Sequence, residues 1–287
     1  HHQGRQVDQL SYNPPTADST HLDLVLVIDT TASMAAEIQV AKERISDIVA
    51  AISEENGGAT IRVAVVGYRD HGEAFVVKVF QPFTTDMPEI QRSLGSMSAD
   101  GGGDGPEAVL EAYQQVQRLP FNPAATALVI HVADAPPHGI EPGDRSDAVQ
   151  ASLRQVAGAF RANGTKVFTV LVEPTIDVYD NARDFYGNFA AETGGAAVAL
   201  KDANKLVPFI TGAATAEVNN RHVRSEVARM AAALDASWTV AAKGRIISKS
   251  IGARGKLKRL VVDGRSVVPA GEEAEGGWGR EAPRGRR

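Results

Sequence analysis

The sequence predicts an α/β fold: a doubly wound, mostly parallel six-stranded sheet with one antiparallel edge strand and helices on both faces. Short apolar runs alternate with amphipathic stretches of helical spacing, which is typical of a parallel sheet covered on both faces. The second and third runs are joined only by "YRDHGEA", which is too short for a crossover helix, so the third strand is expected to be antiparallel and at an edge. A chain of 287 residues, 43% of them hydrophobic, has room for one large domain and a smaller appendage.

Apolar, β-branched runs predict six strands. Their ranges are 22–28, 60–67, 75–80, 126–133, 166–172 and 196–200. Helices are expected between them, near 35–54, 87–97, 106–118, 147–163 and 179–193. The first helix carries apolar residues at the three- and four-residue spacing of a face packed on a sheet: Ile38, Ala41, Ile45, Ile48 and Ile52. A last helix is expected from about Asn204 toward Leu234, and whether Gly212 interrupts it is left open.

Four segments are expected along the chain. Residues 1–19 form a linker that begins with what looks like the end of an expression tag, and residues 20–215 form the globular α/β domain. A helical extension is expected over 216–242. Residues 243–287 are basic, rich in glycine and poor in apolar residues, so we expect a small appendage that is partly disordered.

Composition excludes several classes of protein. Cysteine is absent, which rules out disulfides, thiolate zinc sites and thiol nucleophiles. This favours a cytoplasmic location, although secretion is not excluded because the natural N-terminus could lie upstream. No stretch reaches the roughly 18 continuous apolar residues that a membrane helix needs, so no transmembrane segment is expected.

Charge is distributed unevenly along the chain. From Lys243 onward there are 12 Lys and Arg against 5 Asp and Glu, whereas the rest of the chain carries 18 against 30. The basic tail could contact phosphates of nucleic acid or an anionic membrane. Only Trp238 and Trp278 are available there for base stacking, and neither is interleaved with the charges. A solvated strand pair, or an arm that docks on the acidic body, is therefore favoured over nucleic-acid binding.

The polar residues that stand out lie where predicted strands end. The stretch "VIDTTAS" ends the first strand in Asp29 and brings Thr31 and Ser33 directly after it, and Asp134 ends the fourth strand. The loop "DGGGDGPEA", residues 100–108, leads into the helix before that strand. In open parallel sheets, ligands bind beyond the carboxyl ends of the strands. Converging hydroxyls and carboxylates suit Mg²⁺, Mn²⁺ or Ca²⁺ rather than zinc.

These motifs carry a family resemblance. The D-x-T-x-S pattern, the glycine-rich loop and the aspartate after the fourth strand resemble the metal-ion-dependent adhesion site of von Willebrand factor type A (VWA) domains. More narrowly, "VGYRDHGE", "GGGDGPEA" and "IHVADAPPHG" resemble the VWA domains of von Willebrand/alpha-kinase and hemicentin-like proteins. The resemblance covers about residues 20–215, includes no part of an alpha-kinase catalytic domain, and implies a Rossmann-like VWA fold.

The resemblance also implies a set of metal ligands. Thr31 and Ser33 would ligate a cation directly, while Asp29 and Asp134 would hold it through bound waters. The sixth position would be left for a partner, often an Asp or Glu side chain of another protein. Most such domains have a threonine in the glycine-rich loop where this sequence has Asp104. The extra negative charge is expected to retain the metal without a partner, so either Asp104 moves to a water-mediated position when a ligand arrives or the partner is not acidic.

Simpler interpretations exist for several of these residues. Asp29 or Ser33 could cap the following helix, and the segment from Asp104 to Glu107 resembles a capping box. Arg69 paired with Asp70 is expected to brace the loop after the second strand.

Three histidines also need an interpretation. His71 and His138 could add imidazole ligands for a transition metal near Asp134, but histidines in proline-rich loops usually face solvent, which is the favoured interpretation. His131 lies inside a predicted strand and is expected to be a packed, hydrogen-bonded core residue.

The function that these patterns favour is a metal-dependent protein-interaction module without chemistry of its own. No G-x-G-x-x-G follows the first strand, and no G-K-[ST] or G-x-S-x-G motif is present. The rival is a magnesium-dependent phosphotransferase or hydrolase with Asp29 as nucleophile. Enzymes of the haloacid dehalogenase type place a second aspartate two residues later, where this chain has Thr31. A third interpretation is a regulatory or assembly subunit for a separate ATPase or kinase.

Overall fold

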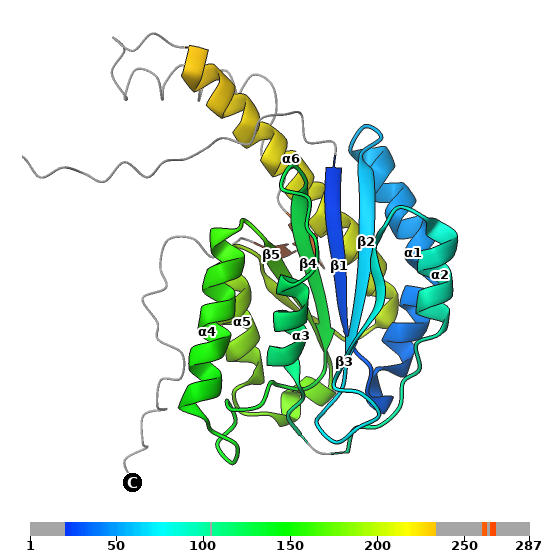
Figure 1. Ribbon diagram of the computed structural model, residues 1–287, viewed down its shortest axis with the longest axis vertical. Helices are drawn as coiled ribbons and strands as arrows, with labels where there is room; N and C mark the ends of the chain where they lie inside the picture. The colour runs from blue at the N-terminus through cyan, green and yellow to red at the C-terminus, as the bar shows by residue number, and fades with distance from the viewer. Residues whose placement is uncertain (1–20, 104, 234–259, 263–264, 268–287) are drawn as a thin grey trace, which may run out of the picture.

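The computed structural model describes residues 21–103, 105–233, 260–262 and 265–267, and its centre is a six-stranded sheet (Figure 1). The strands lie in the order β3-β2-β1-β4-β5-β6. Their bounds are β1 His21–Asp29, β2 Thr60–Tyr68, β3 Val77–Thr84, β4 Thr126–Ala133, β5 Lys166–Val172 and β6 Ala197–Leu200. β3 runs antiparallel to β2, and all other neighbours are parallel. The predicted mostly parallel sheet with one antiparallel edge strand is confirmed.

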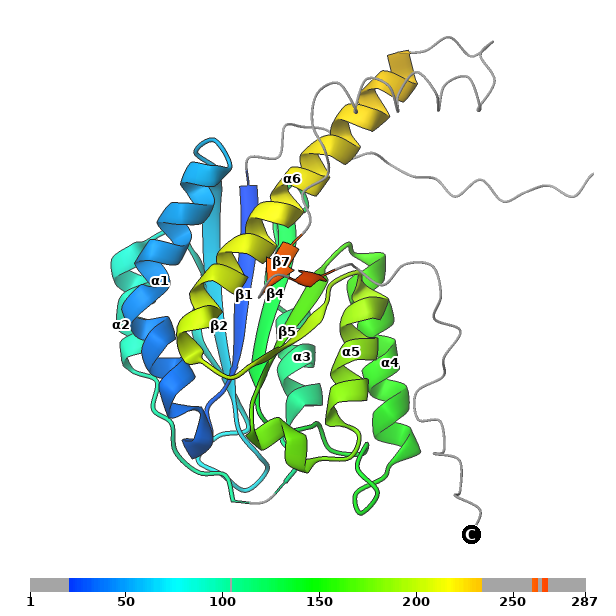
Figure 2. The same cartoon turned by 180° about the vertical axis from the view of Figure 1, so that it is seen from behind.

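Helices cover both faces of the sheet. On one face lie α1 (Ala35–Glu55), α2 (Met87–Gly95) and α6 (Leu206–Ala233), of which α1 and α6 are in front in Figure 2. On the other face lie α3 (Val109–Gln117), α4 (Asp147–Ala162) and α5 (Ala182–Thr193), of which α3 and α4 are in front in Figure 1. Within the described ranges, the short 3-10 helices are η1 Ala32–Met34, η2 Thr175–Val178 and η3 Ala203–Lys205. A separate antiparallel pair is formed by β7 (Leu260–Val262) and β8 (Arg265–Val267).

The central strand β1 shows why its sequence is continuously apolar. Leu24 and Leu26 face the core under α1 and α6, whereas Val25 and Val27 face the core under α3 and α4. Successive side chains of a strand point to opposite faces, so a strand buried on both faces needs apolar residues at nearly every position. Asp29 ends this buried run and is itself buried.

The strand order reverses at β1, and this reversal positions the site. From β1 the chain crosses to β2 on one side, and it later returns to β4 on the other side. The loops that follow β1 and β4 therefore diverge at the carboxyl edge, which is where open α/β sheets form ligand crevices. This edge is at the bottom of Figure 1, and α6 projects from the opposite end.

Two predicted elements differ from the structure. The third strand was expected over 75–80, but β3 is Val77–Thr84, and its pairing with β2 contains register shifts. An edge strand tolerates such irregularity and Pro82, because one side of its backbone has no partner. The helix expected from Pro106 begins only at Val109, because Glu107 forms a β-bridge with Pro137.

The last predicted helix is present as α6, which continues through Gly212 without a break. None of the helices in the described part of the chain has the apolar length that a membrane crossing requires. The prediction of a partly disordered tail falls mainly on residues outside the described ranges, as do Trp238 and Trp278.

Candidate metal centre at the carboxyl edge of the sheet

The two carboxylate oxygens of Asp29 have different surroundings: one accepts hydrogen bonds and the other does not. Its Oδ1 accepts hydrogen bonds from the Thr31 backbone N–H at 2.9 Å and from Thr31 Oγ1 at 2.7 Å. Its Oδ2 is buried and has no hydrogen-bond partner. Neither contact caps α1, so the interpretation of Asp29 as a helix cap is wrong. The turn is held by Thr30, whose backbone N–H and Oγ1 both donate to the Tyr68 carbonyl at 2.9 Å.

The two hydroxyls lie beside each other with their protons directed at carboxylates. Thr31 Oγ1 lies 3.4 Å from Ser33 Oγ, and Thr31 donates to Asp29. The Ser33 side chain hydrogen-bonds the carboxylate of Asp134. A hydroxyl oxygen that gives its proton away still has lone pairs, so both oxygens can accept a further electropositive group. The structure thus brings Asp29, Thr31, Ser33 and Asp134 together, whereas Asp104 lies outside the described residues.

A further carboxylate, Glu107, joins this group although it was not predicted as a ligand. Its side chain is 3% exposed, and its Oε2 has no hydrogen-bond partner. The Glu107 backbone N–H donates to the Pro136 carbonyl at 2.8 Å, which keeps the residue extended and outside α3. Ala108 is the residue that precedes α3, and no side-chain hydrogen bond caps this helix. The capping-box interpretation of Glu107 is therefore wrong.

Glycines allow the loop before Glu107 to pack on the turn after β1. The Gly101 carbonyl accepts from the Ala32 N–H at 3.2 Å, and the Asp100 N–H donates to the Thr30 carbonyl at 3.0 Å. Gly102 has a φ of +76°, and a Cβ there would lie 3.0 Å from Cβ of Thr31. Only glycine combines this backbone conformation with such a close approach.

Arg69 braces the same loop with partners other than the predicted one. Its Nε donates to Thr30 Oγ1 at 3.3 Å, and its Nη2 donates to the Ser98 carbonyl at 3.1 Å. Its Nη1 lies 3.9 Å from carboxylate oxygens of Glu73 and Asp100. The predicted Arg69–Asp70 pair is wrong, because the side chain of Asp70 is bound by His71 and His138 instead.

The carboxyl groups of the site are buried, and too little positive charge lies near them to compensate their negative charge. Burial raises the pKa of Asp29 to about 7, although the hydrogen bonds from Thr31 oppose this rise. Burial also raises the pKa of Glu107 to about 9, with further increments from the charges of Asp29 and other nearby acids. The pKa of Asp134 is raised by burial and lowered in part by Ser33. Carboxylates with unpaired oxygens and hydroxyls with free lone pairs form a donor set that fits a hard divalent cation.

His131 is a core residue, as predicted, and is separate from this group. Its Nε2 lies 2.8 Å from the Tyr68 hydroxyl, and its Nδ1 lies 2.7 Å from the Tyr113 hydroxyl. Burial lowers its pKa to about 3, so the ring is neutral and uses one nitrogen as donor and the other as acceptor. Both ring nitrogens are thereby occupied.

Two curated proteins are similar to part of this chain. Over 128 residues the chain is 31% identical to the alpha-protein kinase vwkA of Dictyostelium discoideum, which covers 44% of this chain and 20% of that protein. Over 199 residues it is 25% identical to the ariadne-like RING finger protein R811 of Acanthamoeba polyphaga mimivirus. This match covers 65% of this chain and 19% of that protein. The chain thus spans about a fifth of the length of these curated relatives.

A solved structure and a family model complete the comparison. The structure of a von Willebrand factor type A protein from Catenulispora acidiphila superimposes with a TM-score of 0.51 at 14% identity, covering 69% of this chain and 43% of that one. This likeness shows the fold alone. The family model described as the von Willebrand factor A domain matches residues 23–202. Because this match includes more than half of the sequence and the sheet has the corresponding topology, the chain belongs to the von Willebrand factor A domain family.

Proposed function

We propose that this VWA domain is a protein-binding module whose binding depends on a divalent cation: Mg²⁺, or else Mn²⁺ or Ca²⁺. VWA domains are generally protein-interaction modules, and the present proposal adds a metal and its ligands. The proposed metal-holding residues are Asp29, Thr31, Ser33, Asp104 and Asp134, with Glu107 as an additional carboxylate. The domain is proposed to have no catalytic activity of its own.

The observation that carries this proposal is a set of unpaired oxygens. Among the residues that the structure describes, the buried carboxylate oxygens without a hydrogen-bond partner are Asp29 Oδ2, Glu107 Oε2 and Asp134 Oδ2. The charge of Asp134 adds to the rise in the pKa of Asp29, and the charges of Asp29 and Asp134 both add to the rise in the pKa of Glu107. A buried, unpaired charge costs several kcal/mol, and it is retained only where a proton, a cation or a partner group compensates it. A divalent cation held near Asp29 and Asp134 would compensate their charges and also stabilise the charged form of Glu107, whose pKa those charges raise.

The exposure of the site supports a role in binding a partner. Asp29, Thr31 and Asp134 are buried, but Ser33 is exposed at the rim of the carboxyl edge. A cation held there supplies a positive charge that a partner's carboxylate can complete as the last ligand. Asp104 would add a negative charge beside the cation, which favours retention of the metal and weakens the attraction of an acidic partner.

Metal titration tests the proposal directly. Isothermal titration calorimetry with Mg²⁺, Mn²⁺ and Ca²⁺ is expected to show one site that is lost in Asp29→Asn and weakened at least tenfold in Glu107→Gln. Asp47→Asn is the matched control, because Asp47 is an exposed residue of α1 paired only with Arg44. Binding of all three metals that is unchanged in Asp29→Asn, or absent from the parent protein, would contradict the proposed site.

Partner binding is tested with the same variants. Proteins captured on the immobilised domain in Mg²⁺ are expected to be released by a chelator and not to bind Asp29→Asn. Capture that is identical with and without chelator would contradict metal dependence. Hydrolysis of generic phosphate esters that disappears in Asp29→Asn would instead favour an enzyme.

A further inference from the structure

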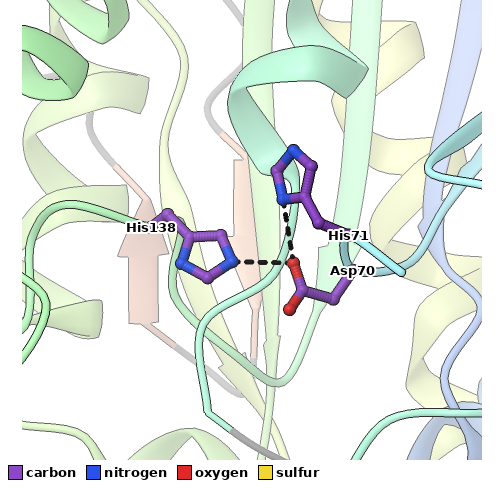
Figure 3. A group of neighbouring side chains, drawn as sticks. All are labelled: Asp70, His71 and His138. Atoms are coloured by element: carbon purple, nitrogen blue, oxygen red, sulfur yellow. Dashed lines mark hydrogen bonds and ion pairs between the residues drawn. The ribbon is translucent and has the colours of Figure 1, made fainter. Parts of the chain in front are cut away.

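A second cluster of metal-binding side chains lies beside the first, on the loops that follow β2 and β4. Asp70 and His71 belong to the loop after β2, and His138 belongs to the loop after β4. Both rings are directed at the same oxygen of Asp70 (Figure 3). Asp70 Oδ1 lies 2.7 Å from His138 Nε2 and 3.2 Å from His71 Nδ1. Three ligand atoms of the three residues lie within 4.8 Å of one another.

The far nitrogen of each ring is held by a different carboxylate. His138 Nδ1 lies 2.9 Å from Asp144 Oδ2, and this oxygen also accepts from the Gly139 N–H at 2.9 Å. His71 Nε2 lies 3.2 Å from Glu111 Oε1, on α3. Metal-bound histidines almost always donate their second ring N–H to a carboxylate or carbonyl, which fixes the ring and makes the free nitrogen more basic. Both histidines of this cluster have that arrangement.

The number of N–H groups on a ring shows which hydrogen bond a metal could replace. A neutral imidazole carries one N–H, so it can donate to only one of its two flanking carboxylates. The His138 ring lies between Asp144 at 2.9 Å and Asp70 at 2.7 Å, so a neutral ring leaves one of these contacts without a proton, and a positive charge on the side of Asp70 would fill it. A proton can supply that charge, and so can a divalent cation bound by the same three atoms.

The donors and their exposure differ from those of the first site. Two imidazole nitrogens and one carboxylate oxygen suit Zn²⁺ and related transition metals, whereas oxygen-only sites suit Mg²⁺ and Ca²⁺. The side chain of Asp70 is 13% exposed, that of His138 33% and that of His71 54%. The cluster is thus shielded at Asp70 and open at His71, as in sites with three protein ligands and one position for water or substrate.

We propose that Asp70, His71 and His138 bind a zinc-type divalent cation, with Asp144 and Glu111 orienting the two rings and a fourth coordination position open to solvent. This site goes beyond the proposed adhesion-type centre, because it uses different residues and a different class of metal.

The site joins segments that are far apart in the sequence. A cation there links the loop after β2 to the loop after β4, and Glu111 adds α3 to the assembly. The His138 N–H also donates to the Glu107 carbonyl at 3.3 Å, so the backbone that carries Glu107 is attached to the same loop. Zinc is therefore expected to raise the melting temperature of the domain.

Zinc affinity, measured by competition with a chromophoric chelator, tests the proposal. The parent protein for this series carries His1→Ala and His2→Ala, so that the N-terminal histidines do not bind metal. One zinc ion per chain is expected, and Co²⁺ in its place should give the intense visible absorption of a four-coordinate site. His71→Ala and His138→Ala are each expected to lower zinc affinity at least tenfold. Asp144→Asn is expected to lower it by about tenfold, the effect typical of a carboxylate that orients a ligating histidine.

Controls separate this site from the first one and from folding defects. Asp29→Asn should abolish magnesium binding and leave zinc affinity within twofold, and His21→Ala should leave both unchanged. His71 is the most exposed ligand, so circular dichroism of His71→Ala should match the parent even if His138→Ala loses a loop contact. Zinc affinity unchanged in His71→Ala, or abolished by Asp29→Asn, would overturn the proposal without bearing on the magnesium site.

Discussion

Replacing Asp29 with asparagine should make the metal-free domain more stable, even though it should abolish metal binding. Burial raises the pKa of Asp29 from 3.8 to about 7, with the charges of Asp134 and Glu73 adding to the rise and hydrogen bonds from Thr31 opposing it. The folded protein therefore binds this proton more tightly than the unfolded chain does. By linkage, the free energy of unfolding falls as pH rises from about 4 to about 7, and the whole cost is present above that range.

The size of the effect follows from the two pKa values. Their difference corresponds to about 4 kcal/mol at pH 8. Asparagine removes this charge and keeps an acceptor for Thr31, but it puts an unpaired amide where Oδ2 was, at a cost of about 2 kcal/mol. The net stabilisation expected for Asp29→Asn is about 2 kcal/mol at pH 8. At pH 5 the Asp29 carboxyl of the folded parent is largely protonated. The difference in stability between Asp29→Asn and the parent should then be close to zero.

Urea unfolding followed by circular dichroism measures this directly. With chelator at pH 8, Asp29→Asn should unfold at a higher urea concentration than the parent. With magnesium at about 100 times its Kd, the parent should gain about 2.7 kcal/mol and the variant nothing, so that the order of stability reverses. Asp47→Asn should behave like the parent in every condition. An Asp29→Asn variant that is less stable than the parent in chelator at pH 8 would refute the assignment of an uncompensated buried charge.

Four further substitutions test other parts of the structure. Gly102→Ala is expected to cost about 2 kcal/mol of stability and to weaken magnesium binding in a calorimetric titration, because its Cβ would lie 3.0 Å from Thr31 at a φ of +76°. Gly57→Ala, at a φ of +68° with open space around it, should cost only the backbone strain of about 1 kcal/mol and leave metal affinity unchanged. His131→Phe should lower the urea midpoint by an amount equivalent to about 2–4 kcal/mol, since two buried tyrosine hydroxyls lose their partner, and should not change metal affinity. Asp104→Thr should lower magnesium affinity in the absence of a partner, and equal affinities in the two proteins would count against a role for Asp104.

The sequence was sufficient to predict the sheet and to place Asp29 and Asp134 at the same edge of it. The run from Leu22 to Ile28 is apolar at all but one position, which only a strand buried on both faces requires. The exception, Asp23, is bound by Arg62 at the opposite end from the site. A carboxylate that ends such a strand must lie at the carboxyl edge, so Asp29 and Asp134 could be placed near each other without coordinates.

Residues whose role depends on a tertiary contact could not be predicted in the same way. Glu107 has the local sequence of a helix start. Its β-bridge to Pro137 keeps it outside α3 and places it near the first cluster of acids. Arg69 and Asp70 are adjacent in the sequence but do not pair with each other, and each has a partner from a distant segment: Ser98 and Asp100 for the arginine, and His138 for the aspartate. Prediction from the sequence favours contacts between residues that are close in the chain, whereas these contacts depend on how distant loops pack together.

One topological fact explains why both clusters lie at the same edge. β2, β1 and β4 are adjacent, and all three end there, so the loops after them must share the space beyond the sheet. Asp29 and Asp70 therefore both contribute to the rise in the pKa of Glu107, although they belong to different clusters. A cation in either cluster would lower the pKa of Glu107 and stabilise its charged form. The acids at this edge of the sheet therefore require a compensating positive charge. The donor atoms on each loop determine which cation can supply it.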